Sequence, residues 1–142
     1  MSVLDMNALV RAYLITSTPL TAPLLTLVGN RIYCPRLPEN AVLPAISYFT
    51  RGGRADANVL NILSPSIQFD CWADNPIGAR AVYRALYDAL QGIGNATVTL
   101  DGANYYITKA REEVQGQDLG DEPIPGYFRV LTFYSITAWD DL

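Results

Sequence analysis

The sequence predicts an α+β fold: a mostly antiparallel β-sheet with two main helices packed on it and a long hairpin loop near the C-terminus. Two segments repeat apolar residues at three- and four-residue spacing, which is typical of helices with one buried face. Other segments alternate apolar and polar residues and are rich in β-branched and aromatic types, as strands are. The dipeptide Asp101-Gly102 separates two such strands, and its residues suit a tight hairpin turn. The 142 residues are long enough for one domain with a sizeable core, and we expect residues 1–142 to form it.

The N-terminal third predicts two helices. The first is expected over Ser2–Thr16, because its apolar residues form one stripe and Pro19 ends the pattern. The second is shorter and runs over Pro23–Val28, with Gly29 as its C-terminal stop. The stripe of the first helix consists of Met6, Leu9, Val10, Tyr13 and Leu14.

The passage Tyr33–Leu43 is expected to be extended. Pro35, Pro38 and Pro44 punctuate it, and proline removes the backbone donor that a helix needs. The passage is therefore predicted to be a connector or an edge segment.

Two strands are predicted next. The first spans Ala45–Arg51 and is stopped by Gly52-Gly53, and the second spans Ser66–Ala73. The residues between them, Gly53–Pro65, are predicted to form a loop or a hairpin excursion.

Asn75–Gly92 is the clearest helix. Asp74 or Asn75 can accept hydrogen bonds from the first-turn amides, and Pro76 lies where proline is tolerated. Its buried stripe is Val82, Ala85, Leu86, Ala89, Leu90 and Ile93.

The C-terminal part predicts three more strands. Ala96–Leu100 and Ala103–Arg111 flank the hairpin turn, and the last strand spans Tyr127–Trp139. The last strand has apolar residues on both of its faces. Such a strand is either central in its sheet or covered by a partner molecule.

Glu112–Gly126 is predicted to be a loop. It holds five acidic residues, three glycines, two prolines and no basic residue. A structureless loop of this length is uncommon in a compact domain and usually indicates either a function or disorder. One interpretation is a solvated hairpin tip, and the other is a segment that is mobile in the free subunit and becomes ordered against a neighbouring one. Its carboxylates lack the regular spacing of a calcium loop, so no metal site is predicted.

Composition excludes several classes of protein. There is no histidine, which removes the commonest general base and the commonest metal ligand. The formal net charge is −4 and the pI is about 4.6, the opposite of the balance in proteins that wrap nucleic acid. We therefore expect no enzyme and no cofactor.

Cys34 and Cys71 are too few for a zinc site. They are predicted to be two buried free thiols, with a single disulfide as the alternative. The apolar stretch from Ala8 to Val28 contains Arg11 and two prolines, so no membrane span is predicted. Without a basic N-terminal region, the protein is expected to be soluble and made in the cytosol.

Two further groups of side chains are candidates for binding. Arg51 and Arg54 flank two glycines and could hold a phosphate or a carboxylate. Because no helix begins after them, we expect them to pair with a neighbouring subunit or remain in water. Tyr127 belongs to an aromatic group near the C-terminus, and aromatic residues are enriched at protein interfaces. The candidate residues for an interface with another subunit or a partner protein are Arg51, Arg54, Glu112, Glu113, Asp118, Asp121, Glu122 and Tyr127.

Four strings in this order resemble the tail-completion (tail-terminator) proteins of long-tailed bacteriophages. The strings are Leu24–Tyr33, Leu43–Tyr48, Ile67–Ala73, which leads directly into the helix from Asn75, and Tyr127–Leu131. The strings hold 28 residues between Leu24 and Leu131, and their order and spacing along the chain carry the resemblance.

The resemblance implies a structural virion protein with no catalytic role. In that family the subunits close into a ring, typically of six, that caps the tail tube, ends its polymerisation and docks to the head connector. The expected partners are other copies of the chain, the tail tube protein and a head connector or neck protein. DNA would pass through the ring without sequence-specific binding. The expected location is the head-proximal end of the tail, after assembly in the cytoplasm of the bacterial host.

Two other hypotheses remain. A head-side neck protein, an adaptor or stopper, belongs to the same structural class. A small-ligand or peptide binding module would use a cleft between the helix from Pro76 and the sheet, which requires converging polar groups. A hydrolase that relies on carboxylates alone is the least supported alternative.

Overall fold

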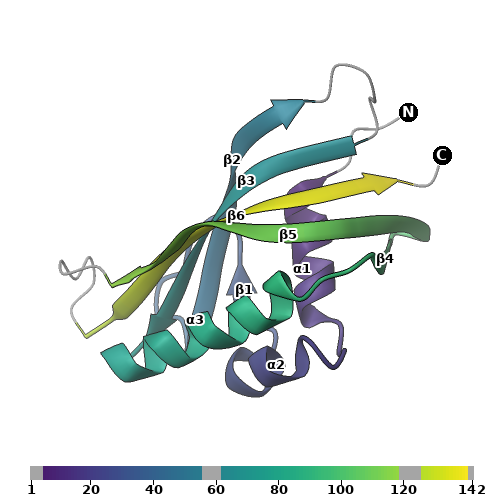
Figure 1. Ribbon diagram of the computed structural model, residues 1–142. Helices are drawn as coiled ribbons and strands as arrows, with labels where there is room; N and C mark the ends of the chain where they lie inside the picture. The colour runs from purple at the N-terminus through teal and green to yellow at the C-terminus, as the bar shows by residue number, and fades with distance from the viewer. Residues whose placement is uncertain (1–4, 56–61, 119–125, 141–142) are drawn as a thin grey trace.

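The computed structural model describes residues 5–55, 62–118 and 126–140, with side chains for residues 5–51, 65–118 and 126–139. The predicted α+β class is confirmed, with three helices and a six-stranded sheet in the described part (Figure 1). The helices are α1 (Met6–Ile15), α2 (Ala22–Val28) and α3 (Pro76–Gln91). The strands are β1 (Ile32–Tyr33), β2 (Ala45–Ala55), β3 (Ile62–Ala73), β4 (Ala96–Leu100), β5 (Ala103–Asp118) and β6 (Phe128–Asp140).

The strands lie in the order β1-β2-β3-β6-β5-β4. All neighbouring pairs are antiparallel except β1 and β2, which are parallel over two residues. The C-terminal strand β6 therefore lies between β3 and β5 in the interior of the sheet. This position confirms the first of the two alternatives predicted for a strand with apolar residues on both faces, a central strand.

The helices begin where the sequence places capping residues. At α1, the Asp5 carboxylate accepts hydrogen bonds from the backbone amides of Asn7 and Ala8 at 3.1 and 3.3 Å. This helix is shorter at its start than the predicted Ser2–Thr16, because Asp5 lies outside it as the cap; residues 1–4 lie outside the described part. At α3, Asn75 accepts from the Gly78 amide at 2.6 Å, as predicted.

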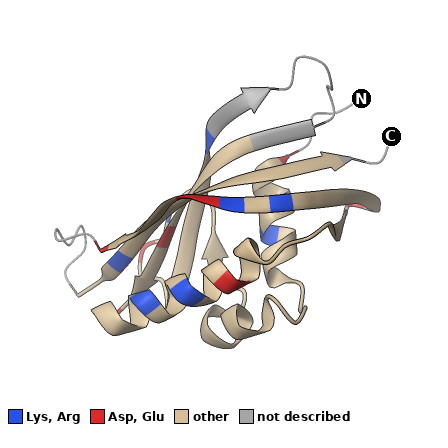
Figure 2. Cartoon of the chain, in the orientation of Figure 1, with Lys and Arg blue, Asp and Glu red and all other residues tan. Residues whose placement is uncertain are grey.

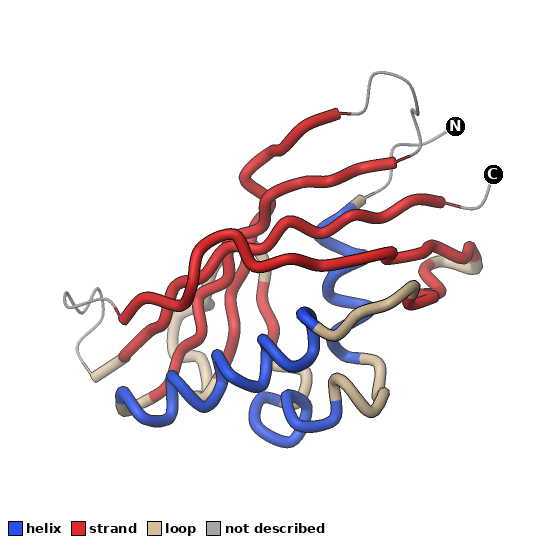
Figure 3. Tube along the Cα trace, viewed as in Figure 1, coloured by secondary structure: helices blue, strands red, loops and turns tan. Residues whose placement is uncertain are grey.

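All three helices pack on one face of the sheet (Figures 1 and 3). The core between them is built from α1, α3 and the alternate side chains of β2, β3 and β6. Its largest fully buried side chains include Tyr48, Phe69 and Tyr134. The Tyr13 hydroxyl crosses from α1 to donate to the Ala89 carbonyl of α3 at 2.6 Å, and burial raises the pKa of Tyr13 to about 12.

The hairpin β2–β3 is longer than predicted, and the prediction that Gly52-Gly53 ends the first strand is wrong. Pairing with β3 is interrupted between Thr50 and Gly53 and then resumes as far as Ala55. A glycine pair suits such an irregularity, which bends a strand without ending it. Of the two interpretations of Gly53–Pro65, a loop or a hairpin excursion, the described residues support the hairpin, and residues 56–61 lie outside the described part.

The long loop predicted for residues 112–126 is also partly wrong. Strand β5 continues to Asp118, with register shifts against β6 at Glu112/Val114 and Val114/Gln117. These shifts accommodate extra residues in β5 while its pairing with β6 continues. The polar composition of the segment gives no indication that it is a strand. The prediction of a loop is therefore wrong for residues 112–118, and residues 119–125 of the predicted loop lie outside the described part.

The predictions of a tight turn at Asp101-Gly102 and of an extended connector after Tyr33 are confirmed. Asp101 and Gly102 have φ values of 51° and 80° and join β4 to β5 in a tight turn. The passage after β1 is a connector, and β1 is an edge strand. The sequence did not predict that β1 pairs in parallel with β2.

Candidate interaction surfaces

Among the described residues, the helices cover one face of the sheet and leave the other without them, and we call this second face the helix-free face (Figures 1 and 2). Along β2, β3 and β6, the residues between the core positions point to this second face. Its side chains are unusually rich in aromatic and basic types for a chain with this net charge. They include Phe49, Arg51, Gln68, Asp70, Trp72, Lys109, Arg111, Glu113, Arg129, Leu131, Phe133, Ser135 and Trp139.

A polar row crosses the helix-free face at mid-sheet. Ser66 on β3 pairs with Ser135 on β6, which pairs with Arg111 on β5. On β2, Arg51 follows Thr50, the partner of Ile67, and so lies beside this row. From that position its guanidinium reaches over β3 and lies 5.0 Å from the centroid of the Phe133 ring.

Glu113 reaches into the same row from the opposite side. Its carboxylate accepts a hydrogen bond from the Ser66 hydroxyl at 2.7 Å, so it spans from β5 across β6 to β3. Two of the predicted interface residues, Arg51 and Glu113, therefore contact the central part of the helix-free face.

Glu112 and Asp118 lie on the other side of the sheet, against α3. The Glu112 carboxylate accepts from the Tyr83 hydroxyl at 2.7 Å and lies 2.9 Å from the Thr132 hydroxyl. Asp118 pairs with Arg80 at 3.1 Å. The predicted acidic cluster is thus divided between two faces, because strand alternation and the register shifts separate residues that are close in sequence.

Three of the predicted residues are not placed. Asp121 and Glu122 lie outside the described residues. Arg54 lies on β2, and its side chain lies outside the described part.

Side chains of α3 cover the outer edge of β5 beyond its pairing with β4. The Gly116 amide donates to the Tyr83 hydroxyl at 3.1 Å, and the Glu112 amide donates to the side-chain oxygen of Gln91 at 3.2 Å. Arg80 donates to the Gly116 carbonyl at 3.3 Å. Burial and the hydrogen bond to Glu112 raise the pKa of Tyr83. These contacts occupy backbone groups that an exposed edge would offer to another strand.

An aromatic and charged cluster closes one end of the helix-free face. Trp72 donates from its indole nitrogen to the Ser47 hydroxyl at 2.9 Å and meets the Tyr127 ring edge-on at 6.5 Å. The Arg129 guanidinium lies 5.4 Å from the Trp72 ring centroid and 3.6 Å from the Asp70 carboxylate. Burial raises the pKa of Asp70, and the positive charge of Arg129 opposes that shift. Tyr127, a predicted interface residue, therefore packs against Trp72 in this cluster.

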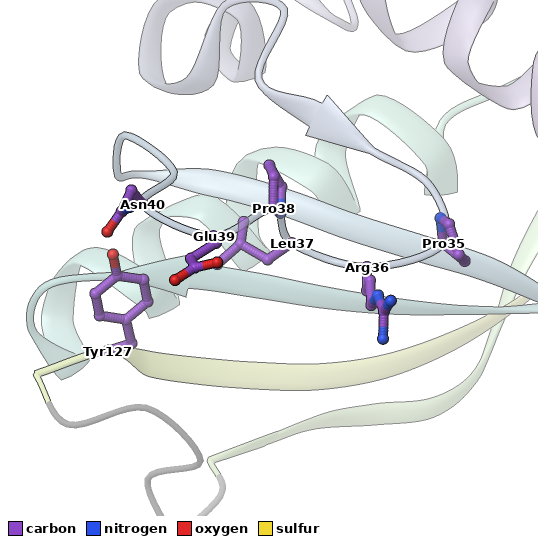
Figure 4. Close-up of a pocket in the computed structure, with 7 residues that line it drawn as sticks. All are labelled: Pro35, Arg36, Leu37, Pro38, Glu39, Asn40 and Tyr127. Carbon is purple, nitrogen blue, oxygen red and sulfur yellow. The ribbon is translucent and has the colours of Figure 1, made fainter.

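A groove of about 810 Å³ adjoins the same cluster. The connector residues 35–40 form one side of it and Tyr127 the other, and the Tyr127 phenol points towards Asn40 and Glu39 (Figure 4). Its charged lining residues, Arg36 and Glu39, are both exposed. The groove lacks a set of buried polar groups converging on one point, which catalysis or tight small-ligand binding would need.

The two cysteines are free and differ in exposure. Cys71 is fully buried on β3, as predicted, and burial raises the pKa of its thiol. The prediction that Cys34 is also buried is wrong, because it lies after the edge strand β1, where the connector leaves the sheet.

Neither a metal centre nor a membrane-spanning helix is found in the described part of the chain. Residues 5–55, 62–118 and 126–140 contain no group of three or more His, Cys, Asp or Glu side chains that could hold a metal ion. Over the same residues no helix is long and apolar enough to cross a bilayer.

Sequence comparison finds no relatives: no protein-family model and no curated protein matches the chain. Structural comparison does find similar chains. The fold is shared with a virion chain. That chain comes from the virion of a native gene transfer agent particle, and it matches with a TM-score of 0.58 over 94% of both chains at 19% identity. The likeness to the virion chain shows a common fold, and it extends over nearly the full length of both proteins.

Several residues of these surfaces were not singled out from the sequence. Lys109 and Arg111 lie beyond the hairpin turn in a segment identified only as a strand. Asp70 and Arg129 are separated by 59 residues (129 − 70), and only the pairing of β3 with β6 brings them together. The sequence gives one indication that Asp70 belongs to such a surface: it is a charged residue within an otherwise apolar strand.

Proposed function

We propose that this chain is a structural protein of a phage-like virion that caps the tail tube as a ring, ends tube polymerisation and forms the head–tail joining interface. The observation that supports the proposal is the full-length fold likeness to the virion chain, which covers 94% of both proteins. The resemblance of the four sequence strings to tail-completion proteins supports the more specific position at the end of the tail. A sheet with one helix-free face offers the surface that such assembly requires.

The proposed partners are other copies of the chain, the tail tube protein and a head connector or neck protein. DNA passes through the ring without sequence-specific contacts. The protein functions at the head-proximal end of the tail, after assembly in the cytoplasm of the host. None of these contacts requires chemistry, which suits a chain without histidine.

The decisive experiment removes the protein during particle assembly. Without it, we expect tails of uncontrolled length that fail to join heads, measured by electron microscopy of purified particles. Addition of the purified protein to such tails should restore joining. Tails of normal length that join heads normally would contradict the proposal.

Binding to isolated structures separates this position from the head-side alternative. A tail-completion protein binds isolated tails before heads are added. If the protein binds isolated capsids and not tails, the role is that of a head-side neck protein.

The mass of the free protein gives a further test. A ring of six chains has a mass of about 94 kDa (6 × 15.6 kDa), which light scattering on a size-exclusion column resolves from the monomer.

A further inference from the structure

We infer that the free edge of β4 is a docking site for an extended segment of a different virion protein, which adds to the sheet as a further strand. The inference rests on the proposed function, which supplies the partner proteins, and it adds the place and the mode of contact. The partner segment is defined by its chemistry: it is extended, uncharged and apolar at every second residue.

The backbone of β4 presents hydrogen-bonding groups that no other strand uses. β4 is the last strand of the sheet, so one of its edges has no neighbouring strand (Figure 1). A two-residue turn joins it to β5, so Leu100, and by alternation Val98, are the residues that exchange hydrogen bonds with β5. The amides and carbonyls of Thr97 and Thr99 therefore point away from β5. Both threonines are exposed, and no hydrogen bond to these backbone groups is found among the described residues.

The other described stretches of sheet edge are blocked. At β1, the Arg11 guanidinium donates to the Ile32 carbonyl at 3.1 Å, and the Ile32 amide donates to the Asn30 carbonyl at 2.8 Å. After β1 ends, β2 is bent by the irregularity between Thr50 and Gly53, and such bends turn an edge away from regular pairing. Beyond β4, side chains of α3 bind the outer backbone groups of β5.

The sequence of β4 carries none of the features that deter strand addition. Its five residues, Ala96–Leu100, contain no charge and no proline, and they pair with β5 in unbroken register. Natural edge strands usually carry a charge, a proline or a bulge, which prevents pairing with other chains. Threonine and valine also favour the extended conformation. β4 is therefore suited to accept a strand from another chain, a recognised mode of peptide binding.

The surroundings of β4 indicate which side chains the added strand carries. On the helix side, α1 packs beside β4 and ends at Ile15, which is 36% exposed. Leu20 is 37% exposed, and its side chain lies against Gly92, shortly before β4 begins. Alternate residues of an added strand face this side, and apolar ones cover such surface. Because β4 has no charge, a charged partner strand would find no counter-charge in it.

A second copy of this chain fits the edge less well than a different protein does. The unblocked edge of a second copy is again β4, so two copies would pair β4 with β4 about a two-fold axis. Such a pair is closed and uses up both edges, whereas the proposed ring needs contacts that repeat from subunit to subunit. A strand from a different chain leaves those ring contacts free.

The test removes one outward amide and leaves the hydrogen bonds between β4 and β5 in place. Thr97→Pro deletes an amide that points away from β5, a position at which an edge strand tolerates proline. Thr97→Ala is the matched control, because it removes the same side chain and keeps the amide. Binding of the full-length proteins to isolated tails and to isolated capsids is measured by co-sedimentation, and circular dichroism checks that each variant is folded.

We expect Thr97→Pro to raise the protein concentration for half-saturation of tails by about tenfold or more, equivalent to about 1.4 kcal/mol. Thr97→Ala should bind as the wild type does. Thr99→Lys keeps every amide and places a charge on the same edge, so it should also weaken binding. In the free protein, hydrogen exchange measured by NMR should be fast at the Thr97 and Thr99 amides and slow at Val98.

Three outcomes would overturn the inference. The first is equal binding of tails by the wild type and Thr97→Pro. The second is an equal loss in Thr97→Pro and Thr97→Ala, which would assign the contact to the threonine side chain. The third is slow exchange of the Thr97 and Thr99 amides in the free protein, which would show that α1 or a second copy already occupies the edge.

The proposed function is judged separately in the same experiment. Wild-type protein that binds capsids and not tails contradicts the proposed position, and the effect of Thr97→Pro on capsid binding then tests the edge. Wild-type protein that binds neither structure overturns both proposals.

Discussion

The ring of Tyr83 on α3 lies directly against the backbone of Gly116 on β5. A Cβ atom at position 116 would be 2.7 Å from two ring carbons of Tyr83, closer than side chains approach. The same tyrosine hydroxyl accepts a hydrogen bond from the Gly116 amide and donates one to Glu112. Gly116 therefore permits the contact between α3 and the irregular part of β5.

Gly116→Ala should lower the free energy of unfolding by about 1–3 kcal/mol, the usual range for inserting atoms into a packed site. The added methyl group forces either the strand or the Tyr83 ring to move, and moving the ring breaks its two hydrogen bonds. Urea unfolding followed by circular dichroism measures the change.

Gly94→Ala is the matched control, since a Cβ atom there has no neighbour within 4 Å. It should change stability by no more than about 1 kcal/mol, and in the stabilising direction if it restricts the unfolded chain. Equal losses in the two variants would contradict the role assigned to Gly116.

Tyr83→Phe should cost about 1–2 kcal/mol, because it removes one donor to the Glu112 carboxylate and leaves the Gly116 amide without its acceptor. Tyr87→Phe is the control: Tyr87 is one turn further along α3, is 38% exposed and has no hydrogen bond among the described residues. Its substitution should be nearly neutral. If both variants unfold at the same urea concentration, the hydroxyl of Tyr83 contributes nothing.

The parts of the fold that sequence predicts well are those determined by local chemistry. Asn75 and Pro76 define the start of α3, and Asp101-Gly102 defines the β4–β5 turn. The two-sided apolar pattern of β6 predicts either a central strand or one covered by a partner, and the structure places it in the interior of the sheet.

The parts that sequence misses depend on pairing between distant strands. Gly52-Gly53 and the acidic run from Glu112 both look like ends of strands, yet pairing with β3 and β6 carries each strand further. The candidate site shows the same effect, because its acidic residues are adjacent in sequence and belong to opposite faces. Local composition does not record register, and register decides which face a side chain occupies.

Asp70 should make stability depend on pH. Burial raises the pKa of this carboxyl above its value in the unfolded chain, with Arg129 opposing the shift, so the folded state holds the proton more tightly. Unfolding then releases a proton, and the contribution of Asp70 to stability falls as pH rises from the unfolded pKa to the folded one. Above the folded pKa the contribution stays constant.

Asp70→Asn removes this titration. The free energy of unfolding of the variant minus that of the wild type should therefore increase as pH rises through this window and then level off. Urea unfolding of both proteins at a series of pH values measures the difference. A difference that is flat, or that decreases with pH, would show that Asp70 does not titrate in this way.

The two thiols should differ in reactivity with an aromatic disulfide reagent. Cys34 is exposed and should react in the folded protein, slowly, because partial burial and the nearby charge of Asp5 raise its pKa and only the thiolate attacks. Cys71 is fully buried, and its raised pKa further suppresses the thiolate, so it should react only after unfolding. We expect one thiol per chain to react in buffer and two in concentrated urea. Cys34→Ser should abolish the reaction in buffer, whereas labelling of both thiols in the folded protein would contradict the burial of Cys71 in the core.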